Sequence, residues 1–495
     1  MYDIRDGSLM NIYVKIVGTL KPIEEWVNWC VSKGFLCIKG CRVGTDATGV
    51  SRVGIARGIE SRIHAEWPLG STMGKQFRIS SGSRKVLIVF GLISLLLMST
   101  LLHWSLRTND AEIHPELVYD RNTVVDDGTH NSNTDLIQWN GTFWMVYATS
   151  PFHMGSSESE LIIQKSADAH EWEIVHSLNL GVKDVRDPKF AIINDTLFLY
   201  ALENEGLVAN PYRTVYSTSV NGIEWSEFSS IPDTEGWLFW RPFMNESGDL
   251  YVPAYWHEHG KSALFKSING THWQQVSIIH EEGGVDETAC EFRSDNSMIC
   301  TVRVEGKADT IIGRNSGGTS IAVAQEPYIH WNHTRDEITR LDGPNLFNVG
   351  NETFAIGRYQ PEQDSMLFQM GGVLSKKRTS IYLVEETGLT YISDLPSAGD
   401  TSYAGVVLDN GTVFTCYYTS NTYSDYPWVI GMLASSNIEF VELNATSLLD
   451  ASKSPLSSEK SWPVGEYVIL IVNIVLDVII VKRFWRIQLP SNEEE

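Results

Sequence analysis

Six tight polar turns recur along the chain, and each joins two runs of apolar and β-branched residues. They occupy residues 139–143, 193–197, 244–250, 292–298, 349–354 and 408–413. Asn, Asp and Gly at the turns tolerate the positive φ of a short hairpin, and the flanking aromatic and β-branched residues favour a half-buried sheet. The turns repeat roughly every 50 residues, which is the length of one four-stranded propeller blade. We therefore predict an all-β fold with a six-bladed β-propeller over residues 125–445.

A second repeat has the pattern Ser-x-Asp/Asn-Gly/Ala-x-x-Trp. It occurs at residues 166–172, 219–225 and 267–273, and each copy follows the first turn of its blade at a similar interval. The hydroxyl and the carboxylate or amide can accept hydrogen bonds from backbone amides of a turn, and the Trp can pack beneath that turn. We therefore expect these copies to be structural.

Residues 86–104 are apolar over about the length of a membrane-spanning helix. Lys75, Arg78, Arg84 and Lys85 precede this segment, and the positive-inside rule then places residues 1–85 in the cytoplasm, with no predicted role. A cleaved signal peptide is the alternative. The apolar run is long for one, and no small-residue cleavage site follows, so we predict an uncleaved anchor.

A second apolar segment, residues 464–481, precedes a basic stretch and is a probable second transmembrane helix. It carries Asn473 and Asp477, which lie four positions apart on one helix face, and this favours a helix–helix contact. An interfacial helix is the alternative. With linkers at 105–124 and 446–463, the propeller would lie on the extracellular side of the membrane, and residues 482–495 would form a cytoplasmic tail.

Potential glycosylation sites agree with this topology. All eight Asn-x-Ser/Thr sequons lie between the two apolar segments, at Asn140, Asn194, Asn245, Asn269, Asn332, Asn351, Asn410 and Asn444. Several coincide with the predicted hairpin turns, where Asn-Gly-Thr also serves the turn itself. We expect a glycoprotein, in a host that uses such sites.

The composition narrows the choice of partners. The chain has 38 basic and 61 acidic residues, a formal net charge of −23, which argues against nucleic acid and anionic lipid surfaces. Cys290 and Cys300 flank the fourth turn and could form a cross-strand disulfide. The three cysteines before residue 72, with His64, fit no common zinc spacing, and no EF-hand-like spacing is present. We therefore expect no metal and no cofactor.

Short charged runs recur about once per blade, near the first turn. They lie at residues 130–135, 185–189, 240–241, 286–287, 300–303, 356–358 and 399–403. In a propeller they would meet near the central axis, and because buried charges must be paired or solvated, such a ring favours a functional pocket. A set of salt bridges between blades is the alternative.

Residues from about 128 to 440 resemble the sialidase superfamily, and most of all a branch whose substrates are largely unassigned. The runs that carry the resemblance are HNSNTD, VRDPKF, WLFWRPF, DETACEF, LDGPNLF and LPSAGDTSYAGVV, in this order. The Ser-x-Asp repeats resemble the Asp box of these propellers, one residue shorter than its commonest form. The resemblance implies that Tyr403 is a nucleophile paired with Glu287, and that Arg303 and Arg358 are two of three substrate-binding arginines.

The chain also departs from that family. The first arginine of the triad is replaced by the run from Ser132 to Asp135, and the loop expected to carry the acid/base offers His153, Glu158 and Glu160 but no clear Asp. We predict a catalytic set and a substrate-binding set. The catalytic residues are Tyr403, Glu287, Asp187 and Asp135, and the substrate-binding residues are His130, Arg186, Trp240, Arg241, Arg303, Arg358 and Asp400.

Two functions remain open at this point. The first is a membrane-anchored, extracellular, sialidase-like glycoside hydrolase with Tyr403 and Glu287 as its central pair. The second is a non-catalytic glycan-binding or adhesion propeller on the cell surface. The retained pair favours the enzyme, while the missing arginine and the uncertain acid favour the binding protein.

Overall fold

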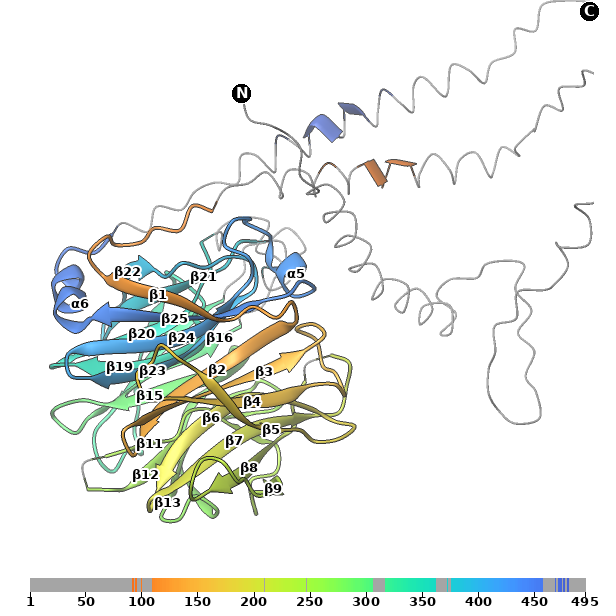
Figure 1. Cartoon of the computed structure of the whole chain (residues 1–495). Helices are drawn as coiled ribbons and strands as arrows, with labels where there is room; N and C mark the ends of the chain where they lie inside the picture. The colour runs from red at the N-terminus through yellow and green to blue at the C-terminus, as the bar shows by residue number, and fades with distance from the viewer. Residues whose placement is uncertain are drawn as a thin grey trace, which may run out of the picture. The chain divides into compact units, whose positions relative to one another are not determined.

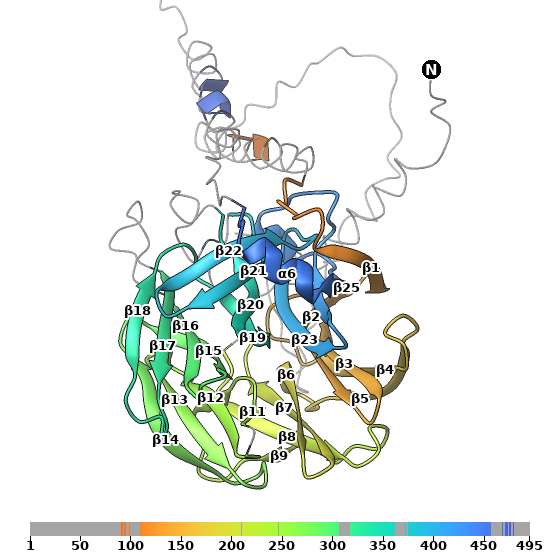
Figure 2. The same cartoon turned by 90° about the vertical axis from the view of Figure 1, so that its left-hand side faces the viewer.

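A computed structural model shows six antiparallel sheets around a common centre (Figures 1 and 2). It describes residues 109–208, 210–245, 247–305, 317–361 and 375–456, together with residues 91, 92, 94, 95, 99, 372, 468, 471–473, 475, 476 and 479. The sheets form a six-bladed β-propeller, so the predicted fold is confirmed.

Blades 1 to 5 are each built from strands that follow one another in the chain, whereas blade 6 also takes in the first strand. Blades 1 and 2 contain β2 (His130–Trp139), β3 (Thr142–Ser150), β4 (Glu160–Ser166), β5 (Glu173–Leu178), β6 (Asp184–Ile193), β7 (Thr196–Asn204), β8 (Arg213–Ser219) and β9 (Ser229–Ser230). Blades 3 and 4 contain β10 (Trp237–Phe239), β11 (Phe243–Met244), β12 (Leu250–Trp256), β13 (Lys261–Ser267), β14 (Trp273–Glu281), β15 (Val285–Phe292), β16 (Met298–Val304), β17 (Gly318–Ala324) and β18 (Asn332–Asp336). Blades 5 and 6 contain β19 (Asp342–Val349), β20 (Glu352–Tyr359), β21 (Arg378–Glu385), β22 (Gly388–Asp394), β23 (Thr401–Asp409), β24 (Thr412–Thr419), β25 (Asn437–Asn444) and β1 (Val118–Val125).

The six predicted turns all join the first two strands of a blade. In blade 1, Trp139 pairs with Thr142 across the turn, and Asn140 and Gly141 have φ of 52° and 73°. Asn410 and Gly411 repeat this geometry in blade 6, with φ of 48° and 82°. Two successive positive φ values give the hairpin twist that matches the flanking strands.

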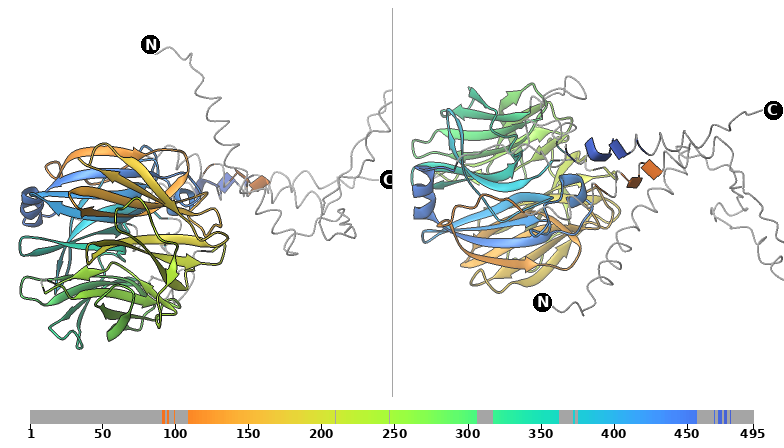
Figure 3. Two further views of the ribbon diagram at one scale, coloured as in Figure 1. Left: turned by 60° about the horizontal axis from the view of Figure 1, so that its bottom comes forward. Right: turned by 90° about the horizontal axis from the view of Figure 1, so that it is seen from above.

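The ring is closed by a strand that the sequence did not reveal. β1 pairs with β25 as the outermost strand of blade 6, so the N-terminal and C-terminal parts of the propeller share one sheet (Figures 1 and 3). Most of β1 had been assigned to the linker at 105–124. Its sequence, VYDRNTVV, is largely exposed and does not alternate, as is common for an edge strand.

Apolar layers between neighbouring sheets form the core. Between blades 1 and 2, for example, Trp144 and Leu161 pack in the same cluster as Phe190 and Leu199. After β24 the short helix α5 (Trp428–Gly431) brings Trp428 towards the centre, and α6 (Ala445–Ser452) follows β25.

The Ser-x-Asp/Asn repeats form the turns between the third and fourth strands. In blade 2, Asn221 Oδ1 accepts hydrogen bonds from the amides of Ile223 and Glu224, and the Trp225 indole donates to the Gly222 carbonyl. Gly222 lies directly against Trp144 of blade 1, because an added Cβ would be 2.0 Å from that ring. These turns therefore help to pack one blade against the next.

Cys290 and Cys300 are paired residues of β15 and β16 and form a disulfide with a Cα–Cα distance of 4.0 Å, which confirms the predicted pairing. Among the residues that the structure describes, no helix is both long and apolar enough to cross a membrane. Residues 1–85 and 482–495, and Asp477, lie outside the described residues. Ser99 in the first apolar segment donates a 2.9 Å hydrogen bond to Asn473 in the second.

A matched pair of glycine substitutions tests the packing between blades. Gly141 and Gly222 both have φ of 73°, but a Cβ at Gly141 would meet nothing within 4 Å. Gly141→Ala should cost only the backbone strain, about 1–2 kcal/mol. Gly222→Ala should cost about 1–3 kcal/mol more, because the Trp144 ring must move. Chemical denaturation of both variants measures the difference, and equal losses would contradict this account of the blade contacts.

Candidate active site

Bulges in the innermost strands turn the backbone towards the propeller axis. The pairing with the second strand shifts by one residue after Ser132 in β2, after Arg186 in β6, after Asp342 in β19 and after Ser402 in β23. The residue that follows has a left-handed φ in all four strands, at Asn133, Asp187, Gly343 and Tyr403. β15 has a comparable shift between Val285 and Thr288, and blade 3 is broken between β10 and β11, where Trp240 and Arg241 lie. Bulges of this kind aim side chains out of a regular sheet and are common beside active sites.

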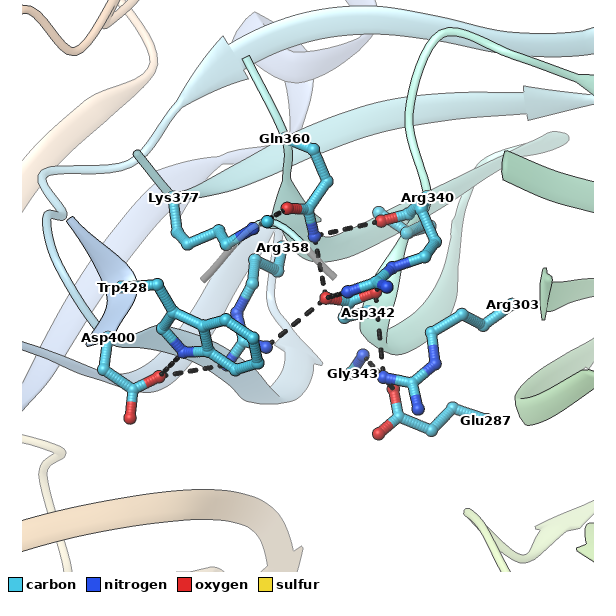
Figure 4. Close-up of polar contacts among 12 residues, drawn as sticks. Glu287, Arg303, Arg340, Asp342, Gly343, Arg358, Gln360, Lys377, Asp400 and Trp428 are labelled. Atoms are coloured by element: carbon cyan, nitrogen blue, oxygen red, sulfur yellow. Dashed lines mark hydrogen bonds and ion pairs between the residues drawn. The ribbon is translucent and has the colours of Figure 1, made fainter. Parts of the chain in front are cut away.

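The central pair consists of Tyr403 and Glu287, from blades 6 and 4. The Tyr403 hydroxyl donates a hydrogen bond to Glu287 Oε1. Glu287 Oε2 accepts from the Gly343 amide at 2.7 Å and lies 3.0 Å from Nη1 of Arg303. Figure 4 shows Arg303 and Gly343 on either side of this carboxylate. Both side chains of the pair are buried, with 7% of Tyr403 and 5% of Glu287 exposed.

Burial changes the acidity of both groups in this pair. It raises the pKa of the Glu287 carboxyl to about 7, with further increases from Asp286 and Asp342. Burial and the neighbouring Glu287 raise the pKa of the Tyr403 phenol well above 10. The phenol is therefore neutral at rest, and Glu287 can take its proton near neutral pH.

Gly343 fixes the position of the tyrosine ring. Its φ is +62°, and a Cβ at this position would lie 2.7 Å from Cδ2 of Tyr403. A side chain here would meet the ring directly, so a glycine is needed both for the bulge and for the approach of Tyr403.

The arginines around the axis are already bound to carboxylates. These pairs are Arg186–Asp184 at 2.6 Å, Arg303–Asp286 at 2.6 Å, Arg340–Asp342 at 2.8 Å, Arg358–Asp400 at 3.2 Å, and Arg241–Asp135. Figure 4 shows Arg303, Arg340 and Arg358 around Asp342. Burial alone would raise the pKa of Asp342, but Arg340, Arg303 and Arg358 outweigh it and hold that pKa well below its usual range.

Blades 1, 2 and 3 contribute the other side of the centre. Arg241 of blade 3 contacts Asp135 of blade 1, and its Nη2 donates to the Ala404 carbonyl of blade 6 at 2.7 Å. Asp135 also accepts from the Phe190 amide at 2.6 Å, so both of its oxygens are occupied. Asp187 accepts a hydrogen bond from Asn133. These contacts link blades across the axis, as the salt-bridge alternative had suggested.

A buried lysine, which the sequence analysis did not select, lies beside this group. Lys189 Nζ is 4.6 Å from the centre of the Trp240 ring, and the side chain is completely buried. Burial, and secondarily Arg241, lower the pKa of Lys189 to about 8. Trp240 is also fully buried, and its indole donates to the Pro344 carbonyl at 2.8 Å.

Asp400 contacts Arg358, and His130 lies next to Asp400. Asp400 Oδ1 accepts from the Trp428 indole at 2.7 Å, the Tyr418 hydroxyl at 3.0 Å and Arg358 at 3.2 Å. The ring of Tyr403 is 5.3 Å from Cζ of Arg358, which connects this group to the central pair. His130 and Asp400 are themselves completely buried.

The structure thus brings the predicted residues together from all six blades. The sequence analysis missed Asn133, Lys189, Arg340, Asp342 and Gly343. One signal could have found some of the bulges: the bulge residues Asp187 and Gly343, and Arg241 at the strand break, each precede a proline. A residue before proline is restricted, and proline interrupts a strand ladder.

Known proteins resemble this chain in structure at low sequence identity. No protein-family model and no curated protein matches the chain. A protein of unknown function from Dyadobacter fermentans is similar in structure, with a TM-score of 0.51 and 14% identity over 67% of this chain and 100% of that one. The Trypanosoma rangeli sialidase bound to sialic acid has a TM-score of 0.48 and 12% identity, and covers 70% of this chain. The endosialidase of phage phi92 has a TM-score of 0.47 and 10% identity over 66% of this chain and 69% of that one.

These likenesses concern the fold alone, and the six antiparallel sheets themselves define the six-bladed β-propeller. The present chain spans 60% of the length of the Trypanosoma rangeli sialidase.

The raised pKa of Glu287 predicts a pH-dependent contribution to stability. The folded protein holds this proton more tightly than the unfolded chain, whose glutamate titrates near 4.5. The stabilisation is therefore complete below about pH 4.5 and is lost as the pH rises through about 7. Glu287→Gln cannot titrate, so wild type should lose about 1–3 kcal/mol relative to this variant over that interval. Urea denaturation of both proteins at several pH values measures this loss. If the stability of wild type relative to Glu287→Gln stayed constant or increased as the pH rose, the assignment would be refuted.

Proposed function

We propose that the protein is a sialidase-like glycoside hydrolase, with Tyr403 as the nucleophile and Glu287 as its general base. The observation that carries this proposal is the hydrogen bond between the Tyr403 hydroxyl and Glu287 at the propeller axis. A phenol is a poor nucleophile until a neighbouring base accepts its proton. The other oxygen of Glu287 is held by Arg303 and Gly343, which fixes the carboxylate in position for this transfer.

The reaction would proceed in two steps. Tyr403 Oη attacks the anomeric carbon while its proton passes to Glu287, and the glycosidic C–O bond breaks with protonation of the leaving oxygen. Water then attacks the anomeric carbon and gives one proton back to the acid that protonated the leaving oxygen, the Tyr403–sugar bond breaks, and the Tyr403 oxygen takes back the proton from Glu287. Asp187 fits the acid better than Asp135, because Asp135 is bound by both Arg241 and the Phe190 amide. Asp187 is also close enough to contribute to the raised pKa of Tyr403.

The charges of the site favour an uncharged polar sugar over a sialic acid. Arg303 and Arg358, the two arginines that the family resemblance assigns to a substrate carboxylate, are bound to Asp286 and Asp400. A carboxylate on the substrate would have to displace one of these side chains and would leave it buried and unpaired. The cost of leaving a charged group unpaired exceeds the gain from one charge-assisted hydrogen bond. Hydroxyl groups of a neutral sugar meet no such competition.

The alternative function, a glycan-binding propeller without turnover, is favoured by a different observation. Tyr403 and Glu287 are almost completely buried, and Arg358 is 1% exposed. A substrate would have to reach the hydroxyl of a tyrosine whose ring is packed between Gly343 and Trp240. A binding protein needs no such access.

A glycan array followed by hydrolysis assays separates the two functions. The protein should bind and hydrolyse neutral glycans, with little binding of sialylated ones. Tyr403→Phe and Glu287→Gln should each lower turnover by about 10²-fold or more while binding changes little. Tyr382→Phe, which removes a hydroxyl from a buried tyrosine on β21, is the matched control and should keep full turnover. Binding without turnover in the wild type would establish the alternative, and turnover that survives in Tyr403→Phe would refute the mechanism.

We also propose that the propeller is anchored on the extracellular side of a membrane, with both termini in the cytoplasm. The two apolar segments support this, and so does the hydrogen bond between Ser99 and Asn473, which joins one segment to the other. The sequon asparagines are accessible, since seven are exposed and Asn245 is partly exposed.

Expression in a eukaryotic host tests this topology. Endoglycosidase treatment should increase the gel mobility of the protein, and epitope tags at both termini should be detected only after the cells are permeabilised. A tag detected on intact cells, or a protein that carries no glycan, would contradict the proposed orientation.

A further inference from the structure

Two histidines and one aspartate converge at the join between blades 1 and 6. His130 begins β2, His153 lies in the loop between β3 and β4, and Asp400 immediately precedes β23. Asp400 Oδ2 is 3.4 Å from His130 Nε2 and 2.7 Å from His153 Nδ1. One ligand atom from each residue falls within 4.8 Å of the other two.

His130 and Asp400 are each held in place by contacts of the atom that does not face the other ligands. His130 Nδ1 is 2.9 Å from the Ala434 carbonyl oxygen, which requires the proton on Nδ1 and leaves the lone pair of Nε2 free. Asp400 Oδ1 accepts from Trp428, Tyr418 and Arg358, so Oδ2 is the oxygen left over. Outer contacts of this kind orient the ligands of a metal ion.

The three converging atoms are buried, and none has a hydrogen-bond partner within the described part of the chain. They are His130 Nε2, His153 Nδ1 and Asp400 Oδ2. Both histidines face the same carboxylate oxygen: His153 Nδ1 is 2.7 Å and His130 Nε2 is 3.4 Å from Asp400 Oδ2. Buried polar atoms need partners, so three that converge on one point indicate a position suited to a shared ligand.

We propose that His130, His153 and Asp400 bind a divalent transition-metal ion, with zinc as the best match. Two imidazoles and a carboxylate are ligands that Zn²⁺ uses at about 2.0–2.2 Å, which in a tetrahedron separates ligand atoms by about 3.3 Å. The His130–Asp400 distance of 3.4 Å already fits this geometry. His153 must withdraw slightly from Asp400, and its position in a loop, with 16% of its side chain exposed, allows this.

The ion would join the first and last blades on the inner side of the ring, while β1 and β25 join its two ends in blade 6. It would also hold Asp400, whose other oxygen binds Arg358 above the Tyr403 ring. The metal site rests on the geometry of these three residues and is independent of the proposed hydrolase activity.

A second cluster provides an internal comparison. Asp120, His170 and Glu442 also bring possible ligands together, but His170 Nδ1 faces Asp120 at 3.8 Å while its Nε2 faces Glu442 at 3.6 Å. The two ring nitrogens point to different carboxylates, and the histidine is 53% exposed. This arrangement is an exposed set of ion pairs.

Calorimetric titration of the chelator-treated, full-length protein with ZnCl₂ tests the proposal. The wild type and His170→Ala should each bind one equivalent, and Zn²⁺ should raise their melting temperature. His153→Ala, whose side chain is on a loop and should not affect folding, should bind Zn²⁺ at least about tenfold more weakly and show no such rise.

Cobalt(II) gives a spectroscopic check on the same ligands. Visible absorption bands of bound Co²⁺ should appear in the wild type and in His170→Ala, and should be lost in His153→Ala and His130→Ala. Absence of saturable Zn²⁺ binding in the wild type would overturn the proposal, and so would binding that is lost in His170→Ala but kept in His153→Ala.

Discussion

The structure around the axis depends on the bulge in each innermost strand. A regular strand would alternate its side chains between the two faces of its sheet, so that they would point at the neighbouring blades. The extra residue breaks this alternation where the strand passes the centre, and Asn133, Asp187, Gly343 and Tyr403 take left-handed backbone conformations there. Such conformations persist only where the surroundings impose them. The blades surround the bulges with packed apolar layers that keep the backbone in this form.

Arginine–aspartate pairs are the second feature of the region around the propeller axis. Each of the five arginines is matched with an aspartate; three of these pairs lie within one blade, Arg358–Asp400 joins blades 5 and 6, and Arg241–Asp135 reaches from blade 3 to blade 1. The two interpretations of the charged runs, a functional pocket and a set of salt bridges, are therefore compatible. The salt bridges neutralise the arginines, and beside them the Tyr403 hydroxyl donates a hydrogen bond to Glu287. A buried ion pair adds little net stability, so specificity of arrangement is the better explanation for so many of them.

The fold could be predicted because its signals are local and repeated. A hairpin turn such as Asn410-Gly411 depends on residues that are adjacent in the chain, and six copies give the number of blades. β1 could not be found in this way, since its partner β25 is more than 300 residues away and β1 itself shows no alternation. The pairing of Tyr403 with Glu287 came from resemblance to a family. The partners of Arg303 and Arg358 could not be foreseen, because those contacts depend on how distant strands meet at the axis.

The most direct measurement is the chemical trapping of the nucleophile. The protein would be incubated with an activated, fluorinated derivative of a neutral glycoside that it hydrolyses, and then digested and analysed by mass spectrometry. The account predicts a covalent sugar adduct on the peptide that contains Tyr403, and no adduct in Tyr403→Phe. An adduct on another residue, or hydrolysis of the same sugar without any adduct on Tyr403, would contradict it.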